Sequence, residues 1–156
     1  MSENKRFVVG LHALTALALA DGETASSDDL AWSANMNPAA VRRVLGQLRE
    51  AGLVRSKPGP SGGFALDRAP EEITLLDVYD AIDRGPLFRA DVNDPNPECP
   101  IGDNIGPVLE GVFEPIEAAL DDALADVTLA HVIDGVGARI EAERGEQSLG
   151  ESGPSS

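Results

Sequence analysis

The stretch from Asn37 to Leu66 constrains the fold most, because it predicts a helix followed at once by a β-hairpin. Asn37 is a favourable N-cap and Pro38 suits the first helical position, so a helix should begin here. Gly52 should adopt the left-handed conformation that ends such a helix. The apolar residues between these ends recur at the spacing of one helical face and should form a buried stripe: Val41, Val44, Leu45 and Leu48.

The opposite face of this predicted helix combines small residues with arginines. Small side chains let the backbone approach a ligand closely, and arginines can bind phosphates or guanine edges. We therefore predict that this face docks on DNA. It consists of Ala39, Arg42, Arg43 and Gly46, with Arg49 on its flank.

Two short apolar segments, 54–56 and 64–66, surround a run rich in Gly and Pro and predict a hairpin with a long tip. The tip carries Lys57, with Arg55 beside it. A surface hairpin with one lysine does not by itself indicate DNA binding. Its position directly after the arginine-bearing helix favours a winged helix-turn-helix.

The residues NPAAVRRVLGQLREAGLVRSKPGPSGGFAL resemble the core of the Rrf-two type (IscR/NsrR/BadM-like) winged helix-turn-helix transcriptional regulators. The resemblance extends through ITLLDVYDAI and NPECPIGDNI and covers roughly residues 6 to 130. It implies a mainly α fold with a small β-wing, and double-stranded DNA as a partner. One departure is Pro58, at the position before the wing Gly-Pro where some members carry an arginine. Insertion of the wing into the minor groove would then require Lys57 to substitute for that arginine. The predicted DNA-binding residues are Ser27, Asn37, Pro38, Ala39, Arg42, Arg43, Gly46, Arg49, Arg55, Lys57, Ser61, Gly62 and Gly63.

The net charge of −15 at first argues against a nucleic-acid binder. Residues 31–68, however, carry six basic and two acidic side chains, a net charge of +4. Residues 69–156 carry four basic and 20 acidic side chains, a net charge of −16. The basic segment is the predicted helix and wing, as expected of a DNA-binding surface. The chain has two lysines against ten arginines and 27 acidic residues, which fits either a cytoplasm of high ionic strength or GC-rich codon usage.

The apolar run 7–20 after Lys5 and Arg6 could be a signal peptide, but it is too short to span a bilayer. The DNA-binding segment that follows favours a buried first helix with His12 packed in it. Ser26 or Ser27 should cap the next helix, with Trp32 at the edge of the core rather than stacked on bases.

The segment 74–77 is a capping box, and Ile73 with Val78 completes a hydrophobic staple at the start of a further helix. Three carboxylates on this helix could suggest acid–base chemistry. No His, Cys or Ser partner lies at a matching spacing, so we predict a solvated face, no catalytic residues and no enzyme activity. These carboxylates are Asp77, Asp80 and Asp83.

An apolar seam at nearly heptad spacing begins after Asp103 and predicts a long helix that pairs with its copy in a second chain. Pro115 should kink or interrupt this helix near Gly111, because proline removes a helix hydrogen bond. The predicted dimer interface consists of Ile105, Leu109, Val112, Ile116, Leu120 and Leu124.

Cys99 is the one cysteine, so the chain can form no intrachain disulfide and no multi-cysteine metal site. Some relatives hold an iron–sulfur cluster through first-helix and cysteine ligands. This chain offers His12 and Cys99 for that role, with Val8 at the acidic ligand position, so we expect no cofactor and no metal unless two chains pool ligands.

The segment NPECPIG looks like the cysteine segment of relatives proposed to sense oxidants or electrophiles. A sensing role for Cys99 and a merely structural role both stay open. Glu98 and Asp103 should disfavour its thiolate, unless Arg84, Arg89 or a helix N-terminus lies close.

We predict a winged helix-turn-helix domain over 1–84, a loop carrying Cys99 over 85–102, dimerisation helices over 103–144 and a disordered tail over 145–156. The predicted function is that of a cytoplasmic, homodimeric DNA-binding regulator without a membrane segment, most simply a repressor. The alternatives are a winged-helix module used for protein contacts and a regulator that responds to a small ligand.

Overall fold

The computed structural model describes residues 1–20, 23–91 and 93–150 and is built mainly of helices. A single antiparallel hairpin accompanies them in this described part of the chain. The elements in chain order are α1 (Glu3–Leu19), α2 (Ser27–Ala34), α3 (Pro38–Glu50), β1 (Val54–Lys57), β2 (Gly63–Leu66), the 3-10 turn η1 (Pro70–Glu72), α4 (Leu75–Ala81), α5 (Pro100–Ala125) and α6 (Leu129–Gly150). The predicted fold class is confirmed.

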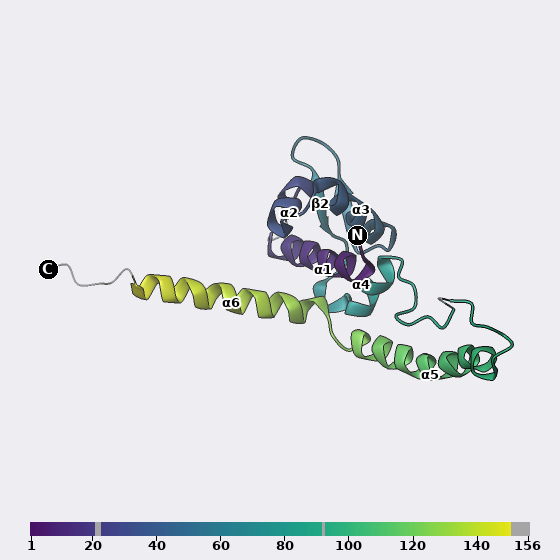
Figure 1. The fold of residues 1–156 in the computed structure, drawn as a ribbon. Helices are drawn as coiled ribbons and strands as arrows, with labels where there is room; N and C mark the ends of the chain where they lie inside the picture. Colours follow the sequence, from purple (N-terminus) through teal and green to yellow (C-terminus); the bar gives the residue numbers. More distant parts are fainter. Residues whose placement is uncertain (21–22, 92, 151–156) are drawn as a thin grey trace.

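Helices α1 to α4 and the hairpin pack around one hydrophobic core, and we call this unit the reading head (Figure 1). Leu129 at the start of α6 is also buried in this core. The predicted stripe of α3 lies at its centre, where Leu45 and Leu48 have no exposed surface. Leu14 of α1 and Val78 of α4 are also completely buried against it. Burial of large aliphatic side chains stabilises a fold by roughly 1.5–3 kcal/mol each, so this core accounts for the stability of the head.

The helix starts of the head follow the predicted capping chemistry. Ser26, rather than Ser27, caps α2 and forms a reciprocal capping box with Asp29. Thr74 and Asp77 form the predicted box at α4. The Asn37 side chain accepts a hydrogen bond from the Ala39 N–H at 2.8 Å. Each cap satisfies N–H groups that the first helical turn leaves without a partner.

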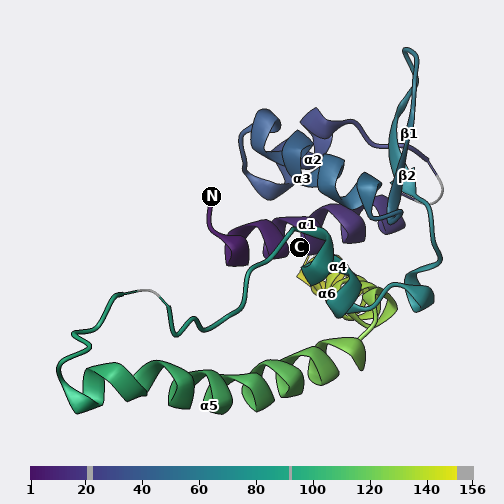
Figure 2. The same cartoon turned by 90° about the vertical axis from the view of Figure 1, so that its right-hand side faces the viewer.

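The hairpin projects from the head as a wing (Figure 2). Its register pairs Val54 with Leu66. Ala25, just before α2, exchanges two backbone hydrogen bonds with Phe64 at 3.0 and 2.8 Å. These bonds fasten the base of the wing to the helix-turn-helix, so wing and helices form one unit.

Helix α5 extends away from the head and contacts α4, and we call it the arm (Figures 1 and 2). It begins at Pro100, three residues before the predicted start, and continues to Ala125 through Pro107 and Pro115. Of the two predicted outcomes near Gly111, a kink or an interruption, the interruption is therefore wrong, and the helix follows a gentle curve (Figure 2). Gly111 is exposed, so water can bind the carbonyl that Pro115 leaves without a helical donor.

Helix α6 continues to Gly150, so the predicted disordered tail is wrong for residues 145–150. Gly145 costs a helix about 1 kcal/mol relative to alanine. The neighbouring residues Glu141, Arg144 and Gln147 have high helix propensity. Their preference offsets the cost of Gly145, so the helix continues through it. The rest of the predicted tail, 151–156, lies outside the described residues.

Two side chains that were predicted to pack lie in solvent instead. Trp32 on α2 is 86% exposed, so it is not a core-edge residue. His12 on α1 is also exposed, and its Nε2 lies 2.8 Å from the Ser33 hydroxyl. The buried residues of the two helices, such as Leu14 on α1 and Leu30 on α2, lie on other faces than His12 and Trp32.

Candidate nucleic-acid interface

Helix α3 presents the predicted docking face to solvent. Ala39, Arg42 and Arg43 are exposed on the side opposite the buried stripe. Gly46 lies between them, and a Cβ at this position would meet no atom within 4 Å. The open space above Gly46 therefore lets another surface approach the helix backbone.

Arg42 is held by the start of α2. Its Nε donates to the Ser27 hydroxyl at 3.0 Å, and its Nη2 donates to Asp28 Oδ1 at 3.2 Å. The two side chains of the ion pair are 56% and 71% exposed. An ion pair this exposed contributes little stability, so Arg42 can exchange the carboxylate for a phosphate or a base. Sequence reasoning missed Asp28, because its contact joins two helices.

Arg43 lies on the other side of this face, in a depression that it shares with Met1, Arg6 and Asn37. Arg6 adds a second cationic group to this side, which sequence reasoning also missed. The Asn37 side-chain oxygen is occupied by the cap of α3, and Pro38 occupies the first helical position. Their contacts in this structure are those of a helix start.

The wing carries the remaining basic groups. Arg55 lies 3.8 Å from Asp67 in an exposed ion pair. Arg49 at the end of α3 donates to the Ser56 hydroxyl at 3.5 Å and so links helix and wing. Lys57 is exposed where β1 ends.

Three predicted binding residues at the wing tip have a structural explanation of their own. A Cβ on Gly62 would overlap the Lys57 carbonyl oxygen, and one on Gly63 would overlap the Ala25 carbonyl. The Ser61 carbonyl accepts a hydrogen bond from the Thr24 hydroxyl at 3.2 Å. The glycines therefore allow backbone segments to pass closely, whatever the tip binds.

The structure thus gathers α2, α3 and the wing on the side of the head away from the arm (Figure 2). All thirteen predicted DNA-binding residues lie in these elements or at their ends. This surface combines an exposed helix bearing arginines with a basic hairpin, the arrangement that enters a major groove and follows the adjacent backbone.

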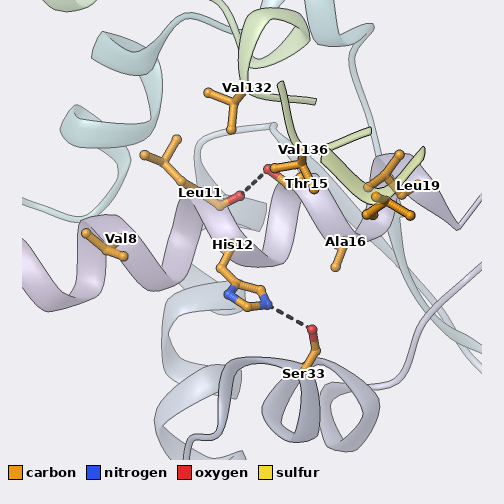
Figure 3. A pocket seen from close by; sticks show the side chains of 10 residues that line it. Val8, Leu11, His12, Thr15, Ala16, Leu19, Ser33, Val132 and Val136 are labelled. Atoms are coloured by element: carbon orange, nitrogen blue, oxygen red, sulfur yellow. Dashed lines mark hydrogen bonds between the residues drawn. The ribbon is translucent and has the colours of Figure 1, made fainter. Parts of the chain in front are cut away.

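A groove of about 420 Å³ lies elsewhere on the head, between α1 and α6 (Figure 3). Val8 and Leu11 of α1 face Val132 and Val136 of α6 across it. The hydrogen-bonded His12–Ser33 pair lies at its edge. This groove is apolar and separate from the docking face.

Cys99 is exposed and occupies the N-cap position of α5. The backbone N–H groups of Gly102 and then Ile101 lower the pKa of its thiol, although the thiol makes no capping hydrogen bond. The exception stated for the thiolate, a helix N-terminus close to Cys99, therefore applies. The helix starts at Pro100 rather than at the predicted Asp103, and this start brings the N–H groups to the sulfur.

In the described part of the chain, no three His, Cys, Asp or Glu side chains come together as metal ligands. With one cysteine, the donor set of a single chain does not fit an iron–sulfur cluster. Among the helices of the described residues, none is long and apolar enough to cross a membrane.

The predicted dimer interface lies along one side of the arm. Ile105, Val112 and Ile116 are 41%, 49% and 45% exposed, and Leu109, Leu120 and Leu124 are partly exposed. Ile101 and Val108, which were not predicted, are exposed by 73% and 62%. Within the described residues this apolar surface is covered only in part.

Comparison with known proteins identifies the family. Residues 4–135 match the model of the Rrf2 family, described as iron-dependent transcriptional regulators. YwnA of Bacillus subtilis (strain 168), named as an HTH-type transcriptional regulator, is 35% identical over 130 residues, which cover 83% of this chain and 96% of YwnA.

Solved structures agree with this match. A transcriptional regulator from Lactobacillus plantarum has the same fold, with a TM-score of 0.75 at 24% identity over 92% of this chain and 97% of that one. Staphylococcus aureus CymR has a TM-score of 0.62 at 25% identity over 83% of this chain and 95% of its own. The chain therefore belongs to the Rrf2 family of DNA-binding transcriptional regulators.

Proposed function

We propose that this regulator acts as a homodimer joined through the arm, and that it represses the promoters to which it binds. The observation that carries the dimer is the exposed apolar side of α5. Nonpolar surface in water costs about 25 cal/mol per Å², and a continuous row of it on a separate helix favours a partner helix. The partner that fits is a second copy, because a two-fold axis pairs the same row with itself.

In such a dimer each α3 helix enters a major groove, with half-sites roughly 34 Å apart. Arg42 and Arg43 are the candidates for contacts with base edges. Arg55 and Lys57 on the wing are candidates for phosphate contacts. A dimer that covers two half-sites of a promoter excludes polymerase by occupancy, which is why repression is the proposed outcome. The protein would act in the cytoplasm, where bacterial DNA lies.

The dimer proposal is tested by charging the seam. In the Leu109→Glu or Ile116→Glu variant, dimerisation would bury an unpaired carboxylate, so both should sediment as monomers. They should also lose affinity for a two-half-site operator, because the half-sites then bind separately. Glu110→Gln on the same helix is the matched control and should remain dimeric. A parent protein that sediments as a monomer at micromolar concentration contradicts the proposal.

We further propose that oxidation or alkylation of Cys99 changes DNA affinity. The support is an exposed thiol of lowered pKa at the first turn of the proposed dimer helix. Peroxide can convert the thiolate to a sulfenic acid, and a second thiol then displaces water to form a disulfide. With one cysteine per chain, that thiol belongs to the partner subunit or to a small molecule. One structure of S. aureus CymR, a protein similar to this one in fold, is of an oxidized form.

A second candidate is regulation by a small ligand in the groove between α1 and α6. The groove has a volume of about 420 Å³ and is lined by apolar side chains with the His12–Ser33 pair at its edge. Size and lining of this kind are typical of small-molecule sites. If oxidant leaves the DNA affinity of the parent unchanged, this candidate replaces Cys99 as the site of the signal. A winged helix used for protein contacts is distinguished from both by the absence of a gel shift with promoter DNA.

A further inference from the structure

Leu129, at the start of α6, packs into the core of the reading head, and Phe88 of the loop contacts Phe113 and Glu117 of the arm. Besides these contacts, the arm is attached to the reading head at two levels. The first level is a pair of backbone hydrogen bonds at its C-terminal end. The Leu75 N–H donates to the Val127 carbonyl at 2.9 Å, and the Leu129 N–H donates to the Ile73 carbonyl at 2.8 Å. These bonds hold one end of α5 against the start of α4. A helix held at one end can still pivot about that end.

The second level is Arg84, which lies just beyond α4 and reaches two turns into the arm. Its Nη2 lies 2.6 Å from Asp121 Oδ1, and its Nη1 lies 3.6 Å from Glu117 Oε2. Its Nε lies 3.0 Å from Asp80 Oδ1 on α4. The guanidinium carbon also lies 4.5 Å from the centre of the Tyr79 ring. We call Arg84 with these three carboxylates the Arg84 clasp.

The Arg84 clasp differs from the exposed ion pairs of this protein. The side chain of Arg84 is 14% exposed and that of Glu117 is 20% exposed. Burial lowers the pKa of Arg84, but hydrogen bonds and charge from Asp80 and Asp121 outweigh it, so the pKa lies above the ordinary value. Removing the arginine would leave Asp121 and Glu117 of the arm, which are 39% and 20% exposed, without their cationic partner, and Asp80 of α4 is a third carboxylate of the same group. This loss should weaken the contact between arm and head.

The backbone before Arg84 is fastened to the DNA-reading side of the head. The Ile82 carbonyl accepts a hydrogen bond from Arg6 Nη1 of α1 at 3.0 Å. It also accepts one from Gln47 Nε2 of α3 at 3.3 Å. Asp83 then adopts a left-handed conformation with φ of 56°, which turns the chain toward the arm. The recognition helix is thus connected to the arm through three consecutive residues, 82 to 84.

From this geometry we propose that Arg84 is a positioning residue for DNA recognition: it fixes the angle between arm and head and so sets the half-site spacing that the dimer accepts. This inference rests on the proposed dimer through α5. In a two-fold dimer a pivot at one joint is repeated at the other, so a small change of angle moves both recognition helices. Loss of the clasp should therefore change the selectivity for half-site spacing more than it changes the affinity for a single half-site.

The test measures the affinities of Arg84→Met and of the parent for a series of DNAs with two identical half-sites. In one DNA the half-sites have the preferred spacing, and in the others the spacing is one or two base pairs shorter or longer. The parent should prefer one spacing by about tenfold or more, because avidity depends on geometry that permits simultaneous binding. Arg84→Met should keep the dimer and the affinity for a single half-site but lose most of this preference. Arg89→Met is the matched control, because Arg89 forms its ion pair with Asp91 in the loop. It should keep the parental profile.

Asp121→Asn weakens the shortest contact of the clasp without removing the arginine. It serves as the test variant if Arg84→Met does not fold. It should broaden the spacing profile in the same direction by a smaller factor. An unchanged profile in folded Arg84→Met overturns the proposal. Equal losses at one half-site and at two would show a general structural role and would also overturn it.

A measurement within one chain separates this inference from the dimer proposal. Spin labels at Glu50→Cys on α3 and Glu110→Cys on the arm, in a Cys99→Ser background, report the distance between head and arm. Labelled protein is mixed with excess unlabelled protein, so each signal comes from one chain. The parent should give one narrow distance distribution and Arg84→Met a broader or shifted one. A monomeric parent would refute the proposed dimer but not the role of Arg84 within one chain. That role is refuted if the parent and Arg84→Met give the same distance distribution.

Discussion

In the reading head Leu14, Leu45 and Leu48 are completely buried, whereas in the arm Val112 and Ile116 keep 49% and 45% of their surface exposed. Both regions are rich in aliphatic residues, so composition does not explain the contrast. The head buries its apolar stripes against other elements of the same chain. The arm has an apolar row that this chain covers only in part, and the proposed assembly with a second copy would bury it.

The contrast extends to the polar groups. Polar contacts in the head are mostly caps and backbone bonds, which satisfy groups that folding would otherwise leave without partners. The Arg84 clasp instead joins the two regions and uses charge at a place where burial is incomplete. The buried core thus lies in the head, and in the proposed dimer the angle between the two heads would depend on this joint.

The largest effect is expected from cavity formation in the head. Leu45→Ala should lower the free energy of unfolding by about 2–5 kcal/mol, because the cavity in a completely buried site can relax only in part. Val112→Ala in the arm should change it by less than about 1 kcal/mol when the protein is diluted below dimer formation. Urea unfolding at several protein concentrations measures both. Similar losses for the two variants under dilution would mean that the arm already packs within the monomer.

An intermediate effect is expected on the docking face. Arg42→Ala and Arg43→Ala should each weaken operator binding by about 1–3 kcal/mol and relax specificity if the side chain reads a base. Arg55→Ala and Lys57→Ala should weaken binding to all sequences, with the salt slope reduced by about one. Fluorescence titration at several salt concentrations distinguishes these outcomes.

Arg139→Ala on α6 is the control for the docking face, since Arg139 is exposed away from α3 and the wing. It should leave operator affinity unchanged. A folded Arg42→Ala/Arg43→Ala double variant that binds as tightly as the parent would refute the assignment of α3 as the recognition helix.

The smallest effect concerns Cys99 at the start of the arm. Its lowered pKa means that, as pH rises, the thiolate forms below the ordinary value of 9.0. The alkylation rate of the folded protein should therefore rise at lower pH than that of the same chain in urea, where the helix N-terminus is lost. Coincident pH profiles would show that the α5 N-terminus does not act on the thiol.

The functional consequence of Cys99 chemistry is measured by DNA titration of the parent and Cys99→Ser under reducing and oxidising conditions. We expect oxidant to change the affinity of the parent alone. Equal changes in both proteins would leave Cys99 with a structural role and would favour the groove between α1 and α6 as the regulatory site.

The sequence by itself determined the parts of this protein that depend on near neighbours along the chain. The stripe of α3, its Asn37 cap, the capping box at Thr74 and the two strands of the wing were all predicted correctly. Each rests on helical periodicity, on a cap within three residues or on a turn, and these are local physics. The apolar row of the arm was also visible, because its spacing is local as well.

Only the tertiary structure decided which groups from distant segments meet. The Arg84–Asp121 contact joins residues 37 apart, and the Arg6–Ile82 bond joins residues 76 apart. Sequence reasoning considered Arg84 only as a possible neighbour of Cys99. It also placed Trp32 at the edge of the core, because a helical pattern does not tell which neighbouring element covers a given face. Such contacts depend on how helices pack in three dimensions, and that packing set the exposure of Trp32 and the joint between head and arm.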